Sequence, residues 1–171
     1  MILLVPIGPV PIYLISWLYD NLGGFTGHTV ESGKAVPLPR AGYDRKREQY
    51  HAEAVMELLM ATYHPGADRI VGLIDQDCYS QGVDFIFGQA TLKGREAFVA
   101  LPRLRPDCSG MEEDKKLFKN RVLKEIVHEL GHTWGLTHCD RPGCVMRFSD
   151  SVKDTDQKNP GFCSRCISRL E

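Results

Sequence analysis

Apolar residues along this chain follow two kinds of spacing, and each spacing predicts a different kind of element. Short apolar runs bounded by glycine, proline or polar residues predict buried strands. We expect such strands over residues 2–7, 69–75, 83–90 and 96–101. Longer segments whose apolar residues recur every three or four positions predict helices that pack on a core. We expect these helices over residues 11–22, 44–62 and from about 111 to 132–134.

Glycine, proline and capping residues mark where several of these elements begin or end. Pro11 suits the first turn of its helix, and the Gly23-Gly24 pair is expected to end that helix. The stretch 23–42 is rich in glycine and proline and leaves room for one short strand. The long third helix has a capping box at its start, because Glu112 follows Ser109 at the spacing of that motif.

The order of the elements predicts an α+β fold with a twisted mixed sheet and helices. Strands and helices alternate at first, and the long helix then lies under a cleft. Residues 139–166 have little apolar pattern and are expected to form a small cysteine-rich lobe. We expect one domain over residues 1–171, with an N-terminal subdomain at 1–135 and a C-terminal subdomain at 136–171.

Composition and charge exclude several classes of partner. The chain has 171 residues, 43% hydrophobic and 25% charged, which is typical of a globular domain with a normal core. Its formal net charge of −1 offers no basic excess to attract nucleic acid or anionic lipid. The basic run at 45–47 is flanked by acids and is interpreted as a solvated helix start. We expect no nucleic-acid or membrane partner, and a monomer.

The apolar start of the chain raises the alternatives of a signal peptide and a membrane span. Nothing basic precedes the apolar run, and Pro6, Pro9 and Pro11 interrupt it. The run is also too short for a spanning helix. We therefore expect a cytoplasmic protein with reduced thiols.

Residues 128–138 form the pattern HExxHxxGxxH. A chance match to its five specified positions in a chain of this length is on the order of one in 10^5. His128 and His132 are one helical turn apart and lie on one face, where both can bind one ion. Gly135 permits a left-handed reversal that returns His138 to the same ion.

Zinc is the ion that this ligand set favours. Three neutral imidazoles leave a fourth position open for water, as in catalytic zinc sites. Glu129 lies beside that position and is the candidate general base, and afterwards the proton donor to a leaving amine. The alternative is three core histidines with satisfied hydrogen bonds, which the spacing of the set disfavours.

Four cysteines, Cys139, Cys144, Cys163 and Cys166, follow the motif directly. A thiolate quartet is a common ligand set of a closed structural zinc site. The alternatives are unremarkable thiols or two disulfides, and disulfides need an oxidising compartment that we do not expect here. A second zinc would stabilise a segment that has little core of its own. We therefore predict two zinc ions per chain, one catalytic and one structural.

The chain resembles the archaemetzincins, a branch of the metzincin clan of zinc peptidases. The resemblance rests on HExxHxxGxxH followed by Cys139, the Cys144-Val145-Met146 run and a distant CxxC. Segments 37–43, 73–78 and 95–105 are also similar to the family. The resemblance implies a zincin-like fold and identifies Met146 as the Met-turn residue, a soft apolar floor under the histidines. Phe148 departs from clan members that have a tyrosine at this position, so no hydroxyl is available there.

The function that the resemblance implies is a zinc metallopeptidase acting on a peptide or protein substrate. In the clan an antiparallel edge strand pairs with the substrate, and residues 98–101 are the candidate here. Arg103 and Arg105 follow that strand and are weak candidates for binding an acidic substrate end. Two alternatives are a zinc-stabilised peptide- or partner-binding protein without turnover, and a zinc amidohydrolase acting on a non-peptide amide.

Overall fold

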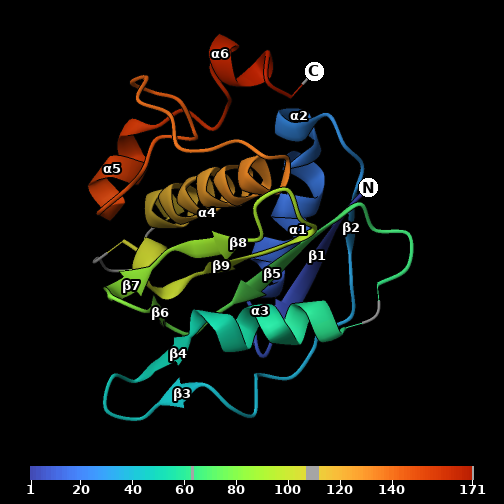
Figure 1. Ribbon diagram of the computed structural model, residues 1–171, viewed down its shortest axis with the longest axis vertical. Helices are drawn as coiled ribbons and strands as arrows, with labels where there is room; N and C mark the ends of the chain where they lie inside the picture. Colours follow the sequence, from blue (N-terminus) through green and yellow to red (C-terminus); the bar gives the residue numbers. More distant parts are fainter. Residues whose placement is uncertain (63, 107–111, 171) are drawn as a thin grey trace.

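A five-stranded sheet in the order β2-β1-β5-β9-β8 forms the centre of the molecule (Figure 1). The computed structural model describes residues 1–62, 64–106 and 112–170, with the backbone alone at 112 and 113. In the order of the sheet, the strands span Val30–Ser32, Ile2–Ile7, Arg69–Ile74, Glu96–Ala100 and Gly88–Ala90. The first four are parallel to their neighbours, and β8 runs antiparallel to β9. The predicted α+β fold with a mixed sheet is confirmed.

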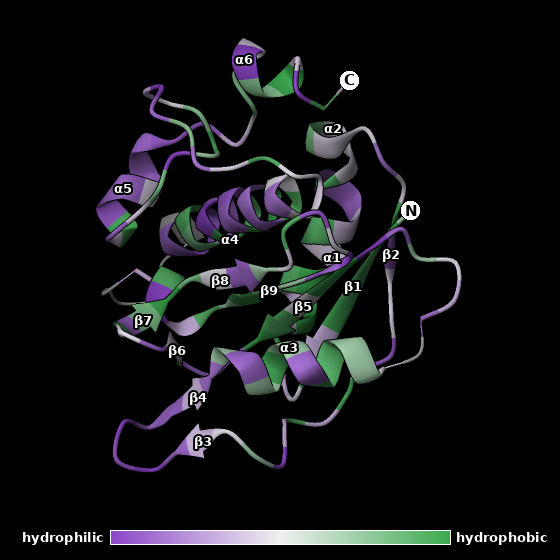
Figure 2. Cartoon of the chain, viewed as in Figure 1, coloured by the Kyte–Doolittle hydropathy of each residue, from purple (hydrophilic) through white to green (hydrophobic). Residues whose placement is uncertain are grey.

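Helices cover both faces of this sheet. α1 (Ile12–Asn21) and α4 (Glu112–Thr133) pack on one face, and α3 (Ala52–Ala61) packs on the other. In β5, Val71 and Leu73 contribute to the first core, whereas Ile70 and Ile74 contribute to the second. Burial on both faces explains why the inner strands are apolar runs without alternation. Figure 2 shows them as the most hydrophobic part of the chain.

A second sheet, of four strands, includes residues that were predicted to form the start of a helix. Its order is β3 (Tyr43–Asp44), β4 (Gln49–His51), β6 (Cys78–Ser80) and β7 (Val83–Ile86). The helix expected at 44–62 begins only at Ala52, because β3 and β4 form a hairpin before it. Asp44 Oδ1 accepts the Lys46 and Arg47 N–H groups at 2.8 and 3.1 Å, which stabilises a turn instead of a helix. The basic run therefore lies in a turn, and its interpretation as a helix start was wrong.

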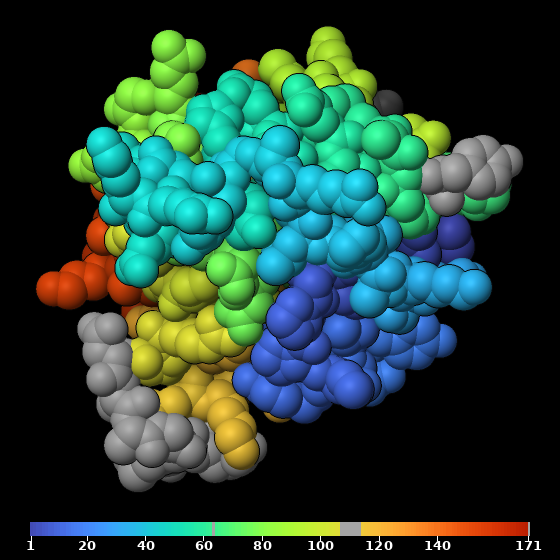
Figure 3. Space-filling view, turned by 90° about the horizontal axis from the view of Figure 1, so that it is seen from below, coloured from blue at the N-terminus to red at the C-terminus, as the bar shows by residue number. Residues whose placement is uncertain are grey.

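Other expectations differ in detail. The strand expected at 83–90 breaks at Phe87 into β7 and β8, which belong to different sheets. β6 was not predicted, whereas β2 is the short strand allowed for within 23–42. The glycine pair at 23–24 begins a short helix, α2 (Gly23–Thr26), directly after α1. Seen from below, the hairpin and α3 (cyan to teal) form the upper part of this face, and N-terminal residues (blue) lie below them (Figure 3).

The C-terminal segment packs over α4. It contains α5 (Val152–Gln157) and α6 (Ser164–Ile167), while η1 (Pro102–Leu104) precedes α4. The Arg121 guanidinium donates two hydrogen bonds to the Asp156 carboxylate, at 2.8 and 2.7 Å, and so links α4 to α5. The predicted capping residue Ser109 lies outside the described residues. Within the described ranges, no helix is both long and apolar enough to cross a membrane.

Candidate functional site

α4 presents His128 and His132 on one face, one turn apart. Their ring centroids are 4.7 Å apart. The opposite side of the helix is anchored in the core, where Ile126, Val127 and Leu130 are fully buried. The helix therefore holds both rings on a rigid support, as the spacing predicted.

Hydrogen bonds to the backbone orient both rings. His128 Nδ1 donates to the Val145 carbonyl at 2.8 Å, and His132 Nδ1 donates to the Leu136 carbonyl at 2.7 Å. Since a carbonyl can only accept, each Nδ1 carries the proton and each Nε2 carries a lone pair. The two Nε2 atoms face each other at 3.1 Å, so two acceptors meet with no proton between them. Tetrahedral zinc with bonds of about 2.05 Å places its nitrogens roughly 3.3 Å apart, so this pair fits a shared cation.

The third histidine reaches the same place through a helix end. Gly135 has φ +93° and donates its N–H to the His132 carbonyl at 2.9 Å, which is the predicted left-handed reversal. Ligand atoms of His128, His132 and His138 then all lie within 4.8 Å of one another. Burial lowers the pKa of each histidine below its usual value, which favours the neutral form that binds metal.

Glu129 is buried against the edge strand β8. Burial, followed by the nearby Glu125 carboxylate, raises the pKa of Glu129 well above its usual value. A Cβ at Gly88 would lie 2.8 Å from Glu129 Oε1 and 2.6 Å from the Phe98 carbonyl oxygen. Only glycine leaves Glu129 this space. Sequence analysis missed Gly88, although a glycine inside a predicted strand is a recognised sign of a close approach.

A buried ion pair lies behind Glu129 and was also missed. Lys158 Nζ is 3.1 Å from Glu125 Oε1, and both side chains are less than 5% exposed. The Thr155 hydroxyl donates to the same carboxylate at 2.8 Å, and Lys158 donates to the Arg147 carbonyl at 3.2 Å. The pair therefore links α4 to the loop that follows Met146. Neither residue belongs to a motif, so no sequence signal pointed to it.

Met146 lies in a turn and is fully buried. A Cβ at Gly131 would lie 2.3 Å from the Met146 sulfur and 3.0 Å from the Phe162 ring. The thioether therefore packs directly against the backbone of α4 between His128 and His132. Gly131 occupies one of the unspecified positions of the motif, and its role as the contact point for Met146 became visible only in the structure.

A cleft of about 670 Å³ opens over the three histidines and Glu129. One wall is β8, and much of the remaining lining is apolar, including Phe85, Leu92 and Phe148. The edge strand predicted at 98–101 is wrong, because β9 is paired on both sides and β8 forms the edge. The segment 98–101 was expected to have free N–H and C=O groups, but β5 and β8 pair with β9 on either side.

The two arginines after β9 are held by acidic residues, and the Arg103 guanidinium also lies over the ring of Phe85 in the cleft wall, 4.2 Å from its centroid. Arg103 donates to the Asp77 carboxylate at 2.7–3.0 Å, and Arg105 forms two 2.6 Å hydrogen bonds with Asp75. Neither arginine lines the cleft. Their charges are used to hold the loop after β5, so the suggestion that they bind an acidic substrate end was wrong.

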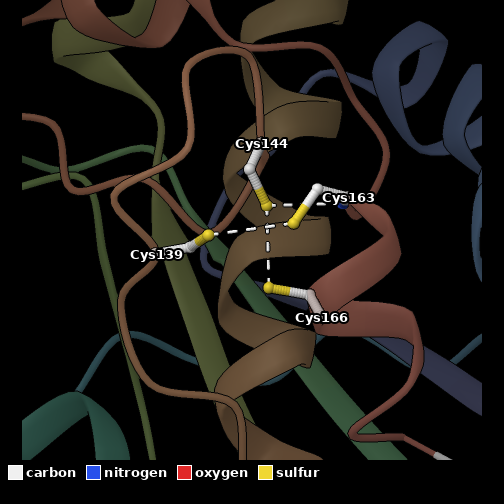
Figure 4. A group of neighbouring side chains, drawn as sticks. All are labelled: Cys139, Cys144, Cys163 and Cys166. Atoms are coloured by element: carbon white, nitrogen blue, oxygen red, sulfur yellow. Dashed lines mark hydrogen bonds between the residues drawn. The ribbon is translucent and has the colours of Figure 1, made fainter.

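The four predicted cysteines converge on one point (Figure 4). The Cys139 and Cys163 sulfurs are 3.8 Å apart, and the Cys144 and Cys166 sulfurs are 3.7 Å apart. Tetrahedral zinc with Zn–S bonds of about 2.3 Å spaces its sulfurs roughly 3.8 Å apart, so the group fits that ion. All four thiols are free, and their sulfurs lie well beyond the length of a disulfide bond, about 2.05 Å. Arg165 donates to the Cys139 sulfur at 3.2 Å and offsets negative charge there.

Comparisons of the sequence and of the structure with known proteins point to the same peptidase family. A model of peptidase family M54 matches residues 35–171. The chain is 39% identical over 179 residues to an archaemetzincin of Pyrococcus furiosus, with 100% of this chain and 92% of the relative covered. The crystal structure of the Methanopyrus kandleri archaemetzincin is similar, with a TM-score of 0.86, 37% identity and coverage of 99% and 93%. A malonate complex of the Archaeoglobus fulgidus archaemetzincin has a TM-score of 0.85 at 32% identity, with 99% of each chain covered.

Proposed function

This chain belongs to peptidase family M54, the archaemetzincins, and we propose that His128, His132 and His138 hold the zinc ion of this metallopeptidase. The observation that carries the assignment is the pair of Nε2 atoms facing each other at 3.1 Å while both Nδ1 atoms are committed to carbonyl groups. An arrangement of two opposed lone pairs is stable when a cation lies between them.

Zinc held by these three histidines would supply Lewis-acid chemistry, polarising a peptide carbonyl and making a neighbouring water more acidic. Glu129 takes a proton from the attacking water and delivers it to the leaving amine. Its burial supports the first of these steps, because a raised pKa makes the carboxylate a stronger base. Gly88 keeps Glu129 in place, and the Lys158–Glu125 pair fixes the helix and loop on either side.

The substrate backbone is proposed to pair with β8. The Ala100 N–H donates to the Phe87 carbonyl at 2.8 Å, and the Thr91 N–H donates to the Glu96 carbonyl at 3.0 Å. Because bonded positions alternate in an antiparallel pair, Gly88 and Ala90 direct their polar groups away from β9. These groups can add an extended peptide as a further strand beside the histidines.

Met146 is proposed as the Met-turn residue, and the four cysteines as ligands of a second, structural zinc. The 3.7–3.8 Å sulfur spacing and the contact of Met146 with Gly131 support these roles. We propose one catalytic domain, with subdomains at 1–135 and 136–171, that acts as a cytoplasmic monomer on peptides or proteins and has no nucleic-acid or membrane partner. Free thiols at the described cysteines support a reducing compartment.

The proposed roles are tested by separating metal binding from hydrolysis. Glu129→Ala is expected to keep the zinc content of the wild type and to lose at least 10^3-fold in kcat/KM on a quenched-fluorescent peptide library. Glu57→Ala, an exposed glutamate on α3, is the control and is expected to retain full activity. Hydrolysis by Glu129→Ala at the wild-type rate would show that another group activates the water.

A further inference from the structure

A second cavity lies away from the catalytic cleft. Its volume is about 920 Å³, and it shares no lining residue with the cleft. It is formed where α2 and the two residues after it, the end of α4 and the segment 161–170 meet. Binding sites for small ligands commonly have volumes of about 300–1,000 Å³ and lie where separate structural elements, such as helices, meet.

One wall of this cavity is aromatic. The His28 ring stacks on the Trp134 indole, with centroids 5.2 Å apart and planes inclined by 22°. Phe162 meets the same indole edge to face at 6.2 Å, and Phe25 adds a further ring to the lining. Ring surfaces in this arrangement favour a flat or branched apolar group.

The lining also contains two basic side chains, Arg69 and Lys93. Arg69 is oriented by donating its Nε–H to the Thr133 hydroxyl at 3.0 Å and an Nη–H to the Asp68 carbonyl at 2.7 Å. None of the carboxylates that the structure describes forms an ion pair with Arg69 or Lys93. The nearby Asp68 carboxylate pairs with the amino terminus instead. The lining residues include no aspartate or glutamate, so the cavity carries positive charge.

We infer that this cavity binds a small carboxylate that carries an aromatic or branched apolar group. The carboxylate lies between Arg69 and Lys93, and the apolar group lies against Trp134 and Phe162. A free aromatic acid and the C-terminal residue of a peptide share this chemistry. Because the cavity and the cleft have separate linings, the ligand binds whether or not the cleft is occupied.

The fluorescence of Trp134 gives a direct readout. The chain has two tryptophans, so Trp17→Phe leaves Trp134 as the single reporter. Titration with 3-phenylpropionate and with the dipeptide Gly-Phe is expected to give saturable changes. The neutral amides of both compounds are expected to bind at least fivefold more weakly. The carboxylate that binds more tightly identifies the source of the ligand, and failure of both to bind overturns the inference.

Two further experiments test whether the carboxylate binds in this cavity. The first uses substitutions of the two basic residues, and the second uses a competing ligand for the catalytic cleft. Lys93→Met and Arg69→Met are expected to weaken the carboxylates at least fivefold and to leave the amides unchanged. Lys93 is exposed, so its replacement leaves the fold intact, and Lys153→Met on α5 is the matched control. Saturating acetohydroxamate, a chelator chosen to bind a zinc ion held by the histidines, is expected to leave the affinity unchanged. Displacement of the probe by acetohydroxamate, or equal binding by the Met variants, would show that the carboxylate binds elsewhere.

Discussion

The histidine centre and the cysteine centre are adjacent in sequence at His138 and Cys139, yet their surroundings differ. The histidine group offers three ligands and faces a cleft of about 670 Å³. The cysteine group offers four ligands, three of them buried, and lies under the C-terminal loops. A site with three protein ligands keeps a coordination position for chemistry, whereas four protein ligands close it. The number of ligands and the access of solvent therefore separate a reactive from a structural metal centre.

The two centres are also supported differently. His128 and His132 belong to a helix whose other side is packed into the main core, so their positions do not depend on metal. The cysteines come from turns and a short helix, α6, held largely by backbone hydrogen bonds and by one another. Metal at the cysteine centre is expected to contribute stability, and metal at the histidine centre is expected to contribute activity.

Removal of a histidine ligand should have the largest effect of these changes. It should reduce activity and leave the stability of the fold nearly unchanged. His132→Ala is expected to reduce kcat/KM by at least 10^4-fold and to lower the zinc count from two to one by native mass spectrometry. The melting temperature should change by only a few degrees, because the helix keeps its core contacts. Loss of both ions in this variant would contradict two independent centres.

Removal of a cysteine ligand should act on both centres. Cys166→Ser is expected to lower the free energy of unfolding by about 3 kcal/mol or more, or roughly 6–12 °C in melting temperature. Activity should fall as well, since the loop with Val145 orients His128. Ser168→Ala, on an exposed residue after α6, is the control. An unchanged melting temperature in Cys166→Ser would mean that the lobe folds without its metal.

A substitution outside both ligand sets tests whether the position of Glu129, and not only the metal, controls activity. Gly88→Ala places a methyl group against Glu129 and the Phe98 carbonyl, so it is expected to reduce kcat/KM about 10- to 100-fold. Both zinc ions should remain, and KM should change less than kcat. Gly24→Ala is the matched control because nothing lies within 4 Å of the added carbon. Equal activity of the two variants would remove Gly88 from the positioning role.

The buried thiol of Cys78 lies apart from the four clustered thiols and should show the smallest effect. It is fully buried, and burial raises its pKa from 9.0 to about 12. The unfolded thiol ionises first as the pH rises, so stability is complete below about pH 8.5 and falls as the pH approaches 12. At pH 9.5 the wild type should lose about 1 kcal/mol more than Cys78→Ala, relative to pH 8, by denaturant unfolding. Parallel pH curves would contradict a neutral buried thiol.

Local patterns predicted much of the fold. The strand at 2–7, the helix after Pro11 and the long metal-binding helix follow from runs and spacings that one segment carries by itself. The failure at 44–51 has a clear cause, since Asp44 and its turn compete with helix formation and the hairpin gains partners in β6. Short strands such as β6 depend on neighbours from elsewhere in the chain, and three residues have too little pattern to reveal them.

The sequence alone predicted both candidate metal-binding groups. The histidines need only one helix and one reversal to meet, and the cysteines form a recognisable set although Cys163 lies 24 residues beyond Cys139. The tertiary structure decided which strand forms the edge of the cleft, why Gly88 must be small, and how Lys158 reaches Glu125. It also brought Arg69, Lys93 and Trp134 around one cavity. These contacts join segments far apart in the chain, and no local periodicity encodes the order in which strands and loops meet.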